Sequence, residues 1–280
     1  MVRLPASVAA RYERFSLYNS PYPAHDRGCA VDLYPGENGG PAPSPVAGTV
    51  RDTRTVRCPP QPYAVEEDHL IVVETDDRLA RVLHVDPAVD SGDEVAVGDS
   101  LGRLVRSGFF GRWVDDHLHL GFRSLDANPY RASGSLPIEI DCEVAPLAWD
   151  GTGTVVETGA SHIRLDAPVS TEGDGFAALA SDEGVPLDGG LAHYDGVGTF
   201  GHAPDRLSLL GTTVATPTET GLAWDDVAVT VDGRRATGLS LFASRVPFGA
   251  KVVFHEGHDF SVGESVRVTL DETDDPIRLG

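Results

Sequence analysis

The chain has 280 residues, of which 41% are hydrophobic, so it is long enough for one large or two ordinary domains with buried cores. Its 43 acidic residues outnumber 22 basic ones, and the formal charge of −21 argues against non-specific binding to nucleic acid or to an anionic membrane surface. Lys251 is the single lysine. An acidic surface nearly free of lysine indicates a halophilic protein, because concentrated salt (~1 M) screens self-repulsion over about 3 Å.

The cysteines and the amino terminus define the expected compartment. Three cysteines do not make a disulfide framework, and no pair of them has Cys-x-x-Cys spacing. The segment Met1–Phe15 lacks the apolar core of a signal peptide, and no uncharged run of about 18 apolar residues is present. We therefore expect a cytoplasmic protein with no membrane partner.

The first half of the chain reads as a series of strands. One short amphipathic helix is expected over Ala6–Phe15. Short apolar runs separated by Gly, Pro, Asp and Asn then predict strands over residues 46–51, 69–74, 81–85, 93–104 and 117–123. Two long loops interrupt them, at 34–45 and 57–68. Loops of this length in a compact domain are usually functional or mobile.

A domain boundary is predicted over Pro129–Pro146, where the strand-like pattern lapses. Beyond it, Asp232-Gly233 predicts a two-residue hairpin turn. Further strands are predicted over 153–157, 163–165, 227–231, 251–255 and 266–270. The predicted fold class is all-β, with a first domain over residues 1–135 and an accessory domain over 144–280 built as a sandwich or small barrel.

The most informative motif is His117-Leu118-His119, in the last predicted strand of the first domain. Residues two apart in a strand point to the same face, so both imidazoles project together while Leu118 and Leu120 anchor the strand in the core. Neutral imidazole is a favoured zinc ligand, and a catalytic zinc site needs about three protein ligands and a water. The alternative is a pair of solvated histidines on an open strand face, so the motif requires partners elsewhere.

Candidate partners lie upstream in a definite order. His25 is followed, after a glycine-containing turn, by Asp32 at the entry to a strand, and His84 lies in the strand-like run 81–85. Two glycine-containing segments separate these residues from the His-x-His motif: Pro45-Val-Ala-Gly-Thr-Val50 and Gly92-Asp-Glu-Val-Ala-Val-Gly98, the second followed by Leu101-Gly102.

In this order, these segments and His117-Leu-His-Leu120 resemble lysostaphin-type zinc metallo-endopeptidases, enzymes that cut peptide cross-links in bacterial cell walls. The resemblance covers about residues 20–130 and extends to Asn128-Pro129. It implies a duplicated-hairpin β fold and hydrolysis of a peptide substrate by a metal-activated water. Position by position, it implies a zinc ion held by His25, Asp32 and His119, with catalytic roles for His84 and His117.

The implied roles are chemically consistent. His117 would take a proton from the water or orient it, and His84 would donate to the oxyanion of the tetrahedral intermediate. Carboxylates that fix histidine tautomers often surround such sites, and the candidates are Asp26, Asp115 and Asp116.

One spacing departs from the family outline. There the first histidine usually lies four residues before the aspartate, whereas His25 lies seven residues before Asp32. A longer turn around Arg27 and Gly28 would still bring His25 to the metal. Otherwise Cys29 or Asp26 is the alternative ligand.

Two other classes of function remain open. One is a non-catalytic metal- or ligand-binding module on the same fold, which the altered spacing and the missing secretion signal favour. The other is a histidine phosphocarrier, which uses a related β fold with two facing histidines. Stoichiometric zinc argues against the carrier, and a protein without zinc supports the module.

Overall fold

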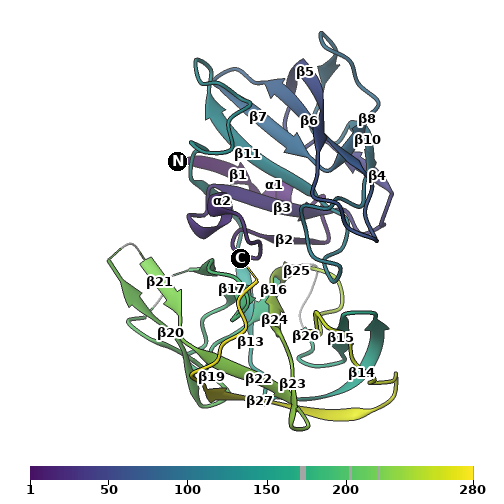
Figure 1. Cartoon of the computed structure of the whole chain (residues 1–280). Helices are drawn as coiled ribbons and strands as arrows, with labels where there is room; N and C mark the ends of the chain where they lie inside the picture. The colour runs from purple at the N-terminus through teal and green to yellow at the C-terminus, as the bar shows by residue number, and fades with distance from the viewer. Residues whose placement is uncertain (171–174, 202–203, 220, 280) are drawn as a thin grey trace. The chain divides into compact units, whose positions relative to one another are not determined.

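The computed structural model describes residues 1–170, 175–201, 204–219 and 221–279, and it consists almost wholly of β-strands (Figure 1). The all-β prediction is confirmed. The chain divides into two compact units: unit 1 comprises Met1–Phe15 and Arg27–Cys142, and unit 2 comprises Ser16–Asp26 and Glu143–Gly280. Among the described residues, none of the helices is long and apolar enough to cross a membrane.

Unit 1 contains one short helix and eleven strands within the described part of the chain, and strand β2 (Arg14–Ser16) leads out of it. Its elements are β1 (Val2–Pro5), α1 (Ala6–Ala9), β3 (Ala30–Tyr34), β4 (Pro41–Pro43), β5 (Gly48–Arg57), β6 (Glu67–Glu74), β7 (Arg78–Leu83), β8 (Val85–Pro87), β9 (Glu94–Val95), β10 (Ser100–Leu104), β11 (Leu118–Ser124) and β12 (Ile138–Asp141).

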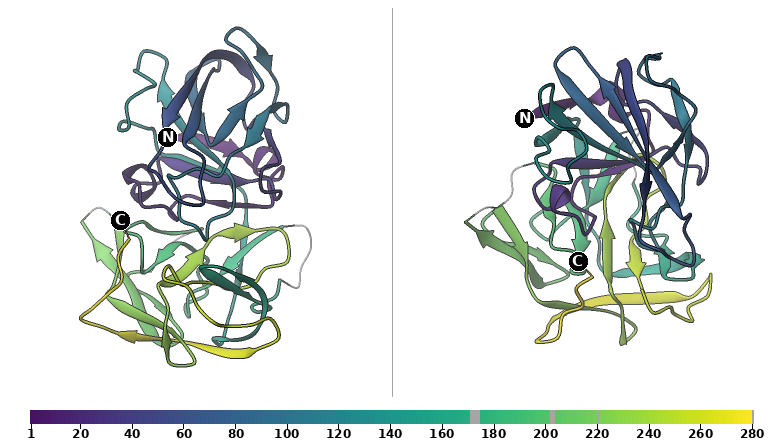
Figure 2. Two further views of the ribbon diagram at one scale, coloured as in Figure 1. Left: turned by 45° about the vertical axis from the view of Figure 1, so that its right-hand side comes forward. Right: turned by 45° about the horizontal axis from the view of Figure 1, so that its top comes forward.

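The main sheet of unit 1 positions the candidate site. Its strands lie in the order β3-β11-β7-β6-β5-β9, and each neighbouring pair is antiparallel. Strands β4, β10 and β8 form a smaller sheet, and β1 pairs in parallel with β12. Figure 2 shows the strong twist of the main sheet from two further directions. This twist is the usual right-handed preference of strands made from L-residues.

The largest local correction concerns the predicted helix over Ala6–Phe15. The helix ends at Ala9, and the chain turns and continues as β2. Tertiary contacts override the helical pattern here: Tyr12 and Phe15 are buried, and the Tyr12 hydroxyl donates to the carbonyl oxygen of Pro43 at 2.8 Å. Helix propensity is a weak preference that such contacts readily outweigh.

Two predicted strands of unit 1 are interrupted. The run 93–104 divides into β9 and β10 because a turn intervenes, in which the Ala96 N–H donates to the Asp99 carboxylate and Gly98 has φ of 95°. The run 81–85 breaks at His84, whose backbone is left-handed with φ of 69°. A positive φ is uncommon outside glycine, so the backbone of His84 is a candidate for a functional constraint.

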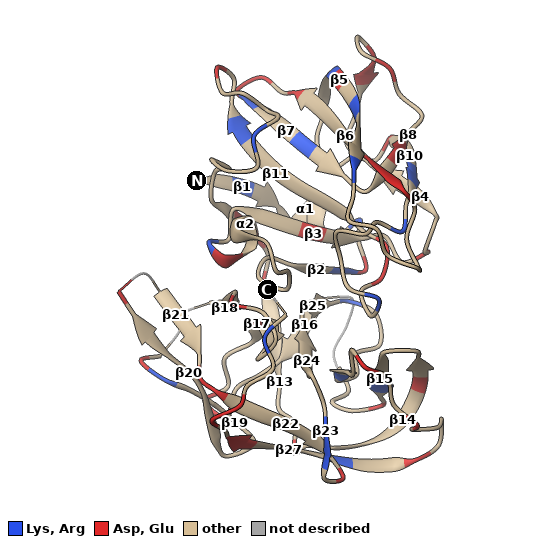
Figure 3. Cartoon of the chain, in the orientation of Figure 1, with Lys and Arg blue, Asp and Glu red and all other residues tan. Residues whose placement is uncertain are grey.

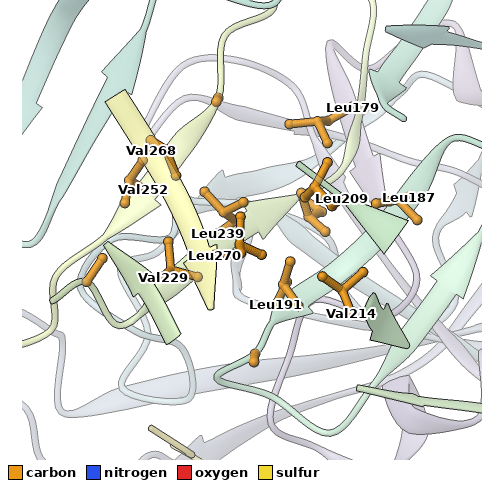
Figure 4. Close-up of a cluster of buried hydrophobic side chains, with 14 of the residues drawn as sticks. Leu179, Leu187, Leu191, Leu209, Val214, Val229, Leu239, Val252, Val268 and Leu270 are labelled. Carbon is orange, nitrogen blue, oxygen red and sulfur yellow. The ribbon is translucent and has the colours of Figure 1, made fainter. Parts of the chain in front are cut away.

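Unit 2 holds the second hydrophobic core, part of which is drawn in Figure 4. Its largest sheet has the order β18-β17-β24-β26-β15-β14-β27-β22-β23, and a smaller one has the order β19-β20-β21. Its elements are α2 (Pro23–Asp26), β13 (Val144–Leu147), β14 (Thr152–Gly159), β15 (His162–Leu165), β16 (Phe176–Leu179), β17 (Leu187–Leu191), β18 (Val197–Thr199), β19 (Leu207–Leu209), β20 (Thr212–Thr218), β21 (Gly221–Trp224), β22 (Val227–Val231), β23 (Arg234–Arg235), β24 (Gly238–Leu241), β25 (Ala243–Ser244), β26 (Lys251–Val253) and β27 (Ser265–Glu272).

The predicted hairpin turn at Asp232-Gly233 is confirmed. Val231 pairs with Arg234, which leaves a loop of two residues, and both have positive φ values of 48° and 80°. These angles belong to the type I′ turn, whose twist matches that of the flanking strands. The strands from β16 to β21 had no sequence prediction, because their short runs lack regular alternation.

Asp188 attaches the segment Ser16–Asp26 to the body of unit 2. Its carboxyl group accepts hydrogen bonds from the Ser16 hydroxyl at 2.5 Å and the Leu17 N–H at 2.7 Å. Burial raises the pKa of Asp188 from 3.8 to about 7, although these hydrogen bonds oppose the shift. The residue is fully buried and links segments far apart in the sequence.

We expect Asp188 to make the stability of the protein fall between about pH 4 and pH 7. Because the folded-state pKa lies above the unfolded one, the folded chain holds this proton more tightly. The stabilisation is complete below pH 3.8 and is lost as the pH rises through about 7. It amounts to about 4 kcal/mol at most. The unfolding midpoint of the parent should fall as the pH rises across this range, and that of Asp188→Asn should vary less. An equal dependence of the midpoint on pH in the two proteins would contradict the prediction.

Candidate metal centre

The pairing of β3 with β11 brings Asp32 and His119 together. The two residues are direct partners in the antiparallel register, and Nδ1 of His119 lies 3.0 Å from Oδ1 of Asp32. Leu118 and Leu120, which alternate with His119, are completely buried, as the sequence predicts. Because side chains alternate along a strand, the buried leucines fix the face on which His119 projects.

His117 immediately precedes β11 and turns to the same aspartate. Its Nε2 lies 3.5 Å from Oδ2 of Asp32. Its Nδ1 lies 2.8 Å from the carbonyl oxygen of Asp115. Because a carbonyl oxygen can only accept, the proton of the neutral ring lies on Nδ1, and Nε2 keeps its lone pair. Burial lowers the pKa of His117 to about 4 against the opposing charge of Asp32, so the ring is neutral at pH 7.

His25 has the same tautomer for the same reason. It lies on α2, is fully buried, and directs Nδ1 at the carbonyl oxygen of Leu17, 2.8 Å away. The proton of the neutral ring therefore lies on Nδ1, and Nε2 keeps a lone pair that a metal ion could bind.

Three of these side chains form a group that could hold a metal ion. One ligand atom from each of His25, Asp32 and His119 lies within 4.8 Å of the other two. They are the three residues that the family resemblance implies as ligands. Neither Cys29 nor Asp26, the alternative ligands, appears in such a group among the described residues. The thiol of Cys29 instead lies 3.5 Å from the carbonyl oxygen of Arg27.

His84 lies beside His117 and is held by a buried carboxylate. The two ring centroids are 5.1 Å apart. Nδ1 of His84 lies 2.5 Å from Oδ2 of Asp68, which is completely buried. Burial acts to raise the pKa of Asp68, but the charge and hydrogen bond of His84 outweigh it, so the pKa lies below its usual value. An ionised carboxylate only accepts, so Nδ1 of His84 carries a proton and Nε2 lies on the side of the ring away from this carboxylate.

Asp68 also fixes the backbone around His84. Its Oδ1 accepts the N–H of His84 at 3.0 Å and that of His69 at 2.6 Å, while the Ser107 hydroxyl donates to Oδ2 at 2.6 Å. These bonds hold the left-handed conformation of His84, which an L-residue adopts only when its surroundings stabilise it.

The sequence analysis did not single out Asp68 as a partner of His84. It follows Glu66 and Glu67, so it reads as one of several solvated acids ahead of an apolar run. The sheet register provides the missing information: Leu70 pairs with Leu83, which places Asp68 beside the end of β7, where His84 lies.

The predicted tautomer-fixing carboxylates have other contacts. Asp115 contributes its backbone carbonyl to His117, and its carboxylate accepts a hydrogen bond from Arg14 at 2.7 Å. The carboxylate of Asp116 accepts the N–H of Gly39 at 3.0 Å and lies 3.3 Å from Arg106. These contacts order the chain just before β11.

Aromatic rings surround the two histidines that lie outside the ligand group. Phe110 packs against His117 with centroids 4.6 Å apart and against His84 at 5.2 Å. Tyr34 packs against His117 at 4.9 Å. Packing of this kind restricts the imidazole orientations and excludes water, which strengthens electrostatic interactions within the site.

Solved structures that match this chain include a mutant of the catalytic domain of the prophage-encoded M23 protein EnpA from Enterococcus faecalis. It is 20% identical with a TM-score of 0.33, over 44% of this chain and 86% of that one. The antimicrobial peptidase lysostaphin from Staphylococcus simulans is 14% identical with a TM-score of 0.30, over 84% of this chain and 88% of that one. The solution structure of lysostaphin is 13% identical with a TM-score of 0.28, over 84% of this chain and 89% of that one. Likeness at this level carries no argument about activity.

No curated protein matches this sequence. Two models of one family do match: the N-terminal domain model over residues 3–140 and the C-terminal domain model over residues 145–271. Both carry the description "domain of unknown function (DUF8155)", and together they span nearly all of the chain. The chain therefore belongs to the DUF8155 family.

Proposed function

We propose that this protein is a zinc-dependent peptide hydrolase whose metal is held by His25, Asp32 and His119. The observation that carries the proposal is the grouping of these three ligand atoms within 4.8 Å. His117 and His84 lie beside the group, and the ordered motifs of residues 20–130 resemble a family of zinc endopeptidases.

The donor set fits zinc. At zinc–ligand distances of about 2.0–2.1 Å, tetrahedral geometry separates neighbouring ligand atoms by about 3.4 Å. The 3.0 Å between His119 and Asp32 is close to that value. Two imidazoles and one carboxylate leave a fourth position for water. Zinc bound there would lower the pKa of such a water toward about 7 and polarise a peptide carbonyl.

The remaining histidines have complementary roles in the proposed reaction. Nε2 of His117 carries a lone pair beside the ligand group and accepts the proton of the attacking water. Nε2 of His84 donates to the oxyanion that forms on the carbonyl when the ring is an imidazolium, with both nitrogens protonated and Nδ1–H bonded to Asp68. The proton accepted by His117 then passes to the leaving amine.

The test combines metal analysis with a peptide assay. Purified full-length protein should contain about one zinc per chain. It should cleave members of a fluorescence-quenched peptide library, lose cleavage on chelation, and regain it when zinc is restored. A protein without zinc, or one that binds zinc but cleaves no member of the library, would instead support the non-catalytic module. Phosphohistidine formation in a zinc-free protein would support the phosphocarrier.

A pair of variants tests the unusual spacing before Asp32. We expect His25→Ala to weaken zinc binding, because the Nε2 lone pair of His25 is a ligand in the proposed site. Cys29→Ala should leave zinc binding unchanged, since the thiol lies near the Arg27 carbonyl. Zinc titration against a competing chelator measures both. A weaker zinc affinity in Cys29→Ala than in His25→Ala would reassign the third ligand.

A further inference from the structure

A buried arginine lies on the same sheet face as the ligand group. In the register of β11 with β7, His119 pairs with Leu83 and Gly121 pairs with Arg81. Alternation along both strands places Arg81 on the face that carries His119, and it places Arg123 on this face as well. Figure 3 shows the blue bands of basic residues on these adjacent strands.

The side chain of Arg81 makes no hydrogen bond or ion pair with any other residue in the described ranges, although only 9% of the residue is exposed. Its Nε is wholly shielded and lacks an acceptor, whereas its two terminal nitrogens are not fully shielded. A desolvated charge without a partner destabilises a fold. A guanidinium in this state is therefore poised to accept an anionic partner.

The neighbour of Arg81 is another cation. Arg123 is buried as well, and its terminal nitrogens donate to the carbonyl oxygens of Ser133 and Arg131, which provide no negative charge. Burial first, and the charge of Arg123 second, lower the pKa of Arg81 to about 10. In a chain with 43 acidic residues and 22 basic ones, a shortage of carboxylates does not explain this arrangement.

We propose that Arg81, assisted by the charge of Arg123, binds a carboxylate of the peptide substrate. This inference rests on the proposed function. The position of the carboxylate relative to the cleaved bond follows from strand geometry. Gly121, which lies opposite Arg81, is two residues beyond His119 on β11, a step of about 7 Å. An extended peptide advances about 3.3–3.6 Å per residue, so the recognised carboxylate lies one or two residues from the cleaved bond.

The carboxylate has two sources in a peptide, the chain terminus or an acidic side chain. A planar guanidinium binds either one through paired, charge-assisted hydrogen bonds. Three probes distinguish them: N-acetyl-Gly-Gly-Gly with a free carboxylate, the same peptide as its amide, and N-acetyl-Gly-Asp-Gly amide. Binding is measured on full-length, zinc-depleted protein by calorimetry, so the result does not depend on catalysis.

The parent should bind at least one carboxylate probe about ten- to a hundredfold more tightly than the amide. Arg81→Gln should abolish this preference, and Arg81→Lys should retain part of it. Arg78→Gln is the matched control, because Arg78 lies on the same strand but on the opposite face, paired with Asp77. It should bind like the parent.

Stability separates ligand binding from a structural role. Without any probe, Arg81→Met should raise the thermal midpoint, since it removes a desolvated charge and keeps the apolar stem. Equal affinity of the parent for all three probes, or a clear fall in the midpoint of Arg81→Met, would overturn the proposal. A carboxylate preference in a protein that binds no zinc would uphold this subsite and refute the proposed hydrolase.

Discussion

Replacing His119 with alanine should reduce bound zinc from about one per chain to near zero and abolish peptide hydrolysis. His119 supplies one of three ligand atoms, and its removal leaves Asp32 and His25 with two further positions to be filled by water. Elemental analysis of the dialysed protein gives the zinc content, and the peptide assay gives the rate. The fold should survive, because β11 keeps the buried leucines on either side of the substitution.

A matched histidine provides the control. His69 lies on β6 of the same sheet, is partly exposed, and has its ring near Asp86 rather than near the ligand group. His69→Ala should therefore keep both zinc and activity. Full zinc occupancy in His119→Ala, together with a native thermal midpoint, would show that the metal centre is wrongly assigned.

The second large effect is expected at Asp68. Asp68→Asn keeps the shape of the side chain but replaces one acceptor oxygen with a donor, so Nδ1 of His84 loses its partner or the ring changes tautomer. We expect kcat to fall about 10²- to 10⁴-fold, the usual range for a lost acid or base, with little change in KM. Zinc content should stay at the parent value, because Asp68 lies outside the ligand group.

Ser107→Ala is the comparison for Asp68→Asn. It removes one hydrogen bond to the same Oδ2 atom but leaves the contact between His84 and the carboxylate intact. Its effect on kcat should be about tenfold or less, and nitrogen chemical shifts should show His84 still protonated on Nδ1. An unchanged kcat in Asp68→Asn would remove His84 from the proposed reaction.

The sequence predicts the centre of this site because its chemistry is concentrated in one short motif. His117-Leu118-His119 shows both the strand alternation and the imidazole pair, and the structure confirms that Leu118 and Leu120 are buried. The predicted catalytic and ligand roles still await experiment. The structure adds the pairing of Asp32 with His119 in the register of β3 and β11. This pairing brings together two residues that belong to separate motifs in the sequence.

Other features of the site and fold depend on which strands pair, and no pattern in the local sequence indicates them. Asp68 resembles its acidic neighbours until the register of β6 with β7 places it beside His84. Arg81 lies in an ordinary apolar run, and only burial without a partner distinguishes it. The grouping of Ser16–Asp26 with unit 2 follows from contacts to Asp188, more than 170 positions away in the chain. Such contacts cannot be read from spacing alone.

The register of β3, β11 and β7 also limits how relatives of this protein can vary in length. Inserting or deleting one residue within Leu118–Ser124 would reverse the orientation of every side chain that follows in the strand, so that residues such as Leu120 would leave the face on which they are now buried. The loop at residues 58–66, between β5 and β6, carries no such constraint, because both of its ends are fixed by the hairpin. Length differences within the family should therefore gather in such connections, and an unchanged β11 length would be a sign that a relative retains the metal centre.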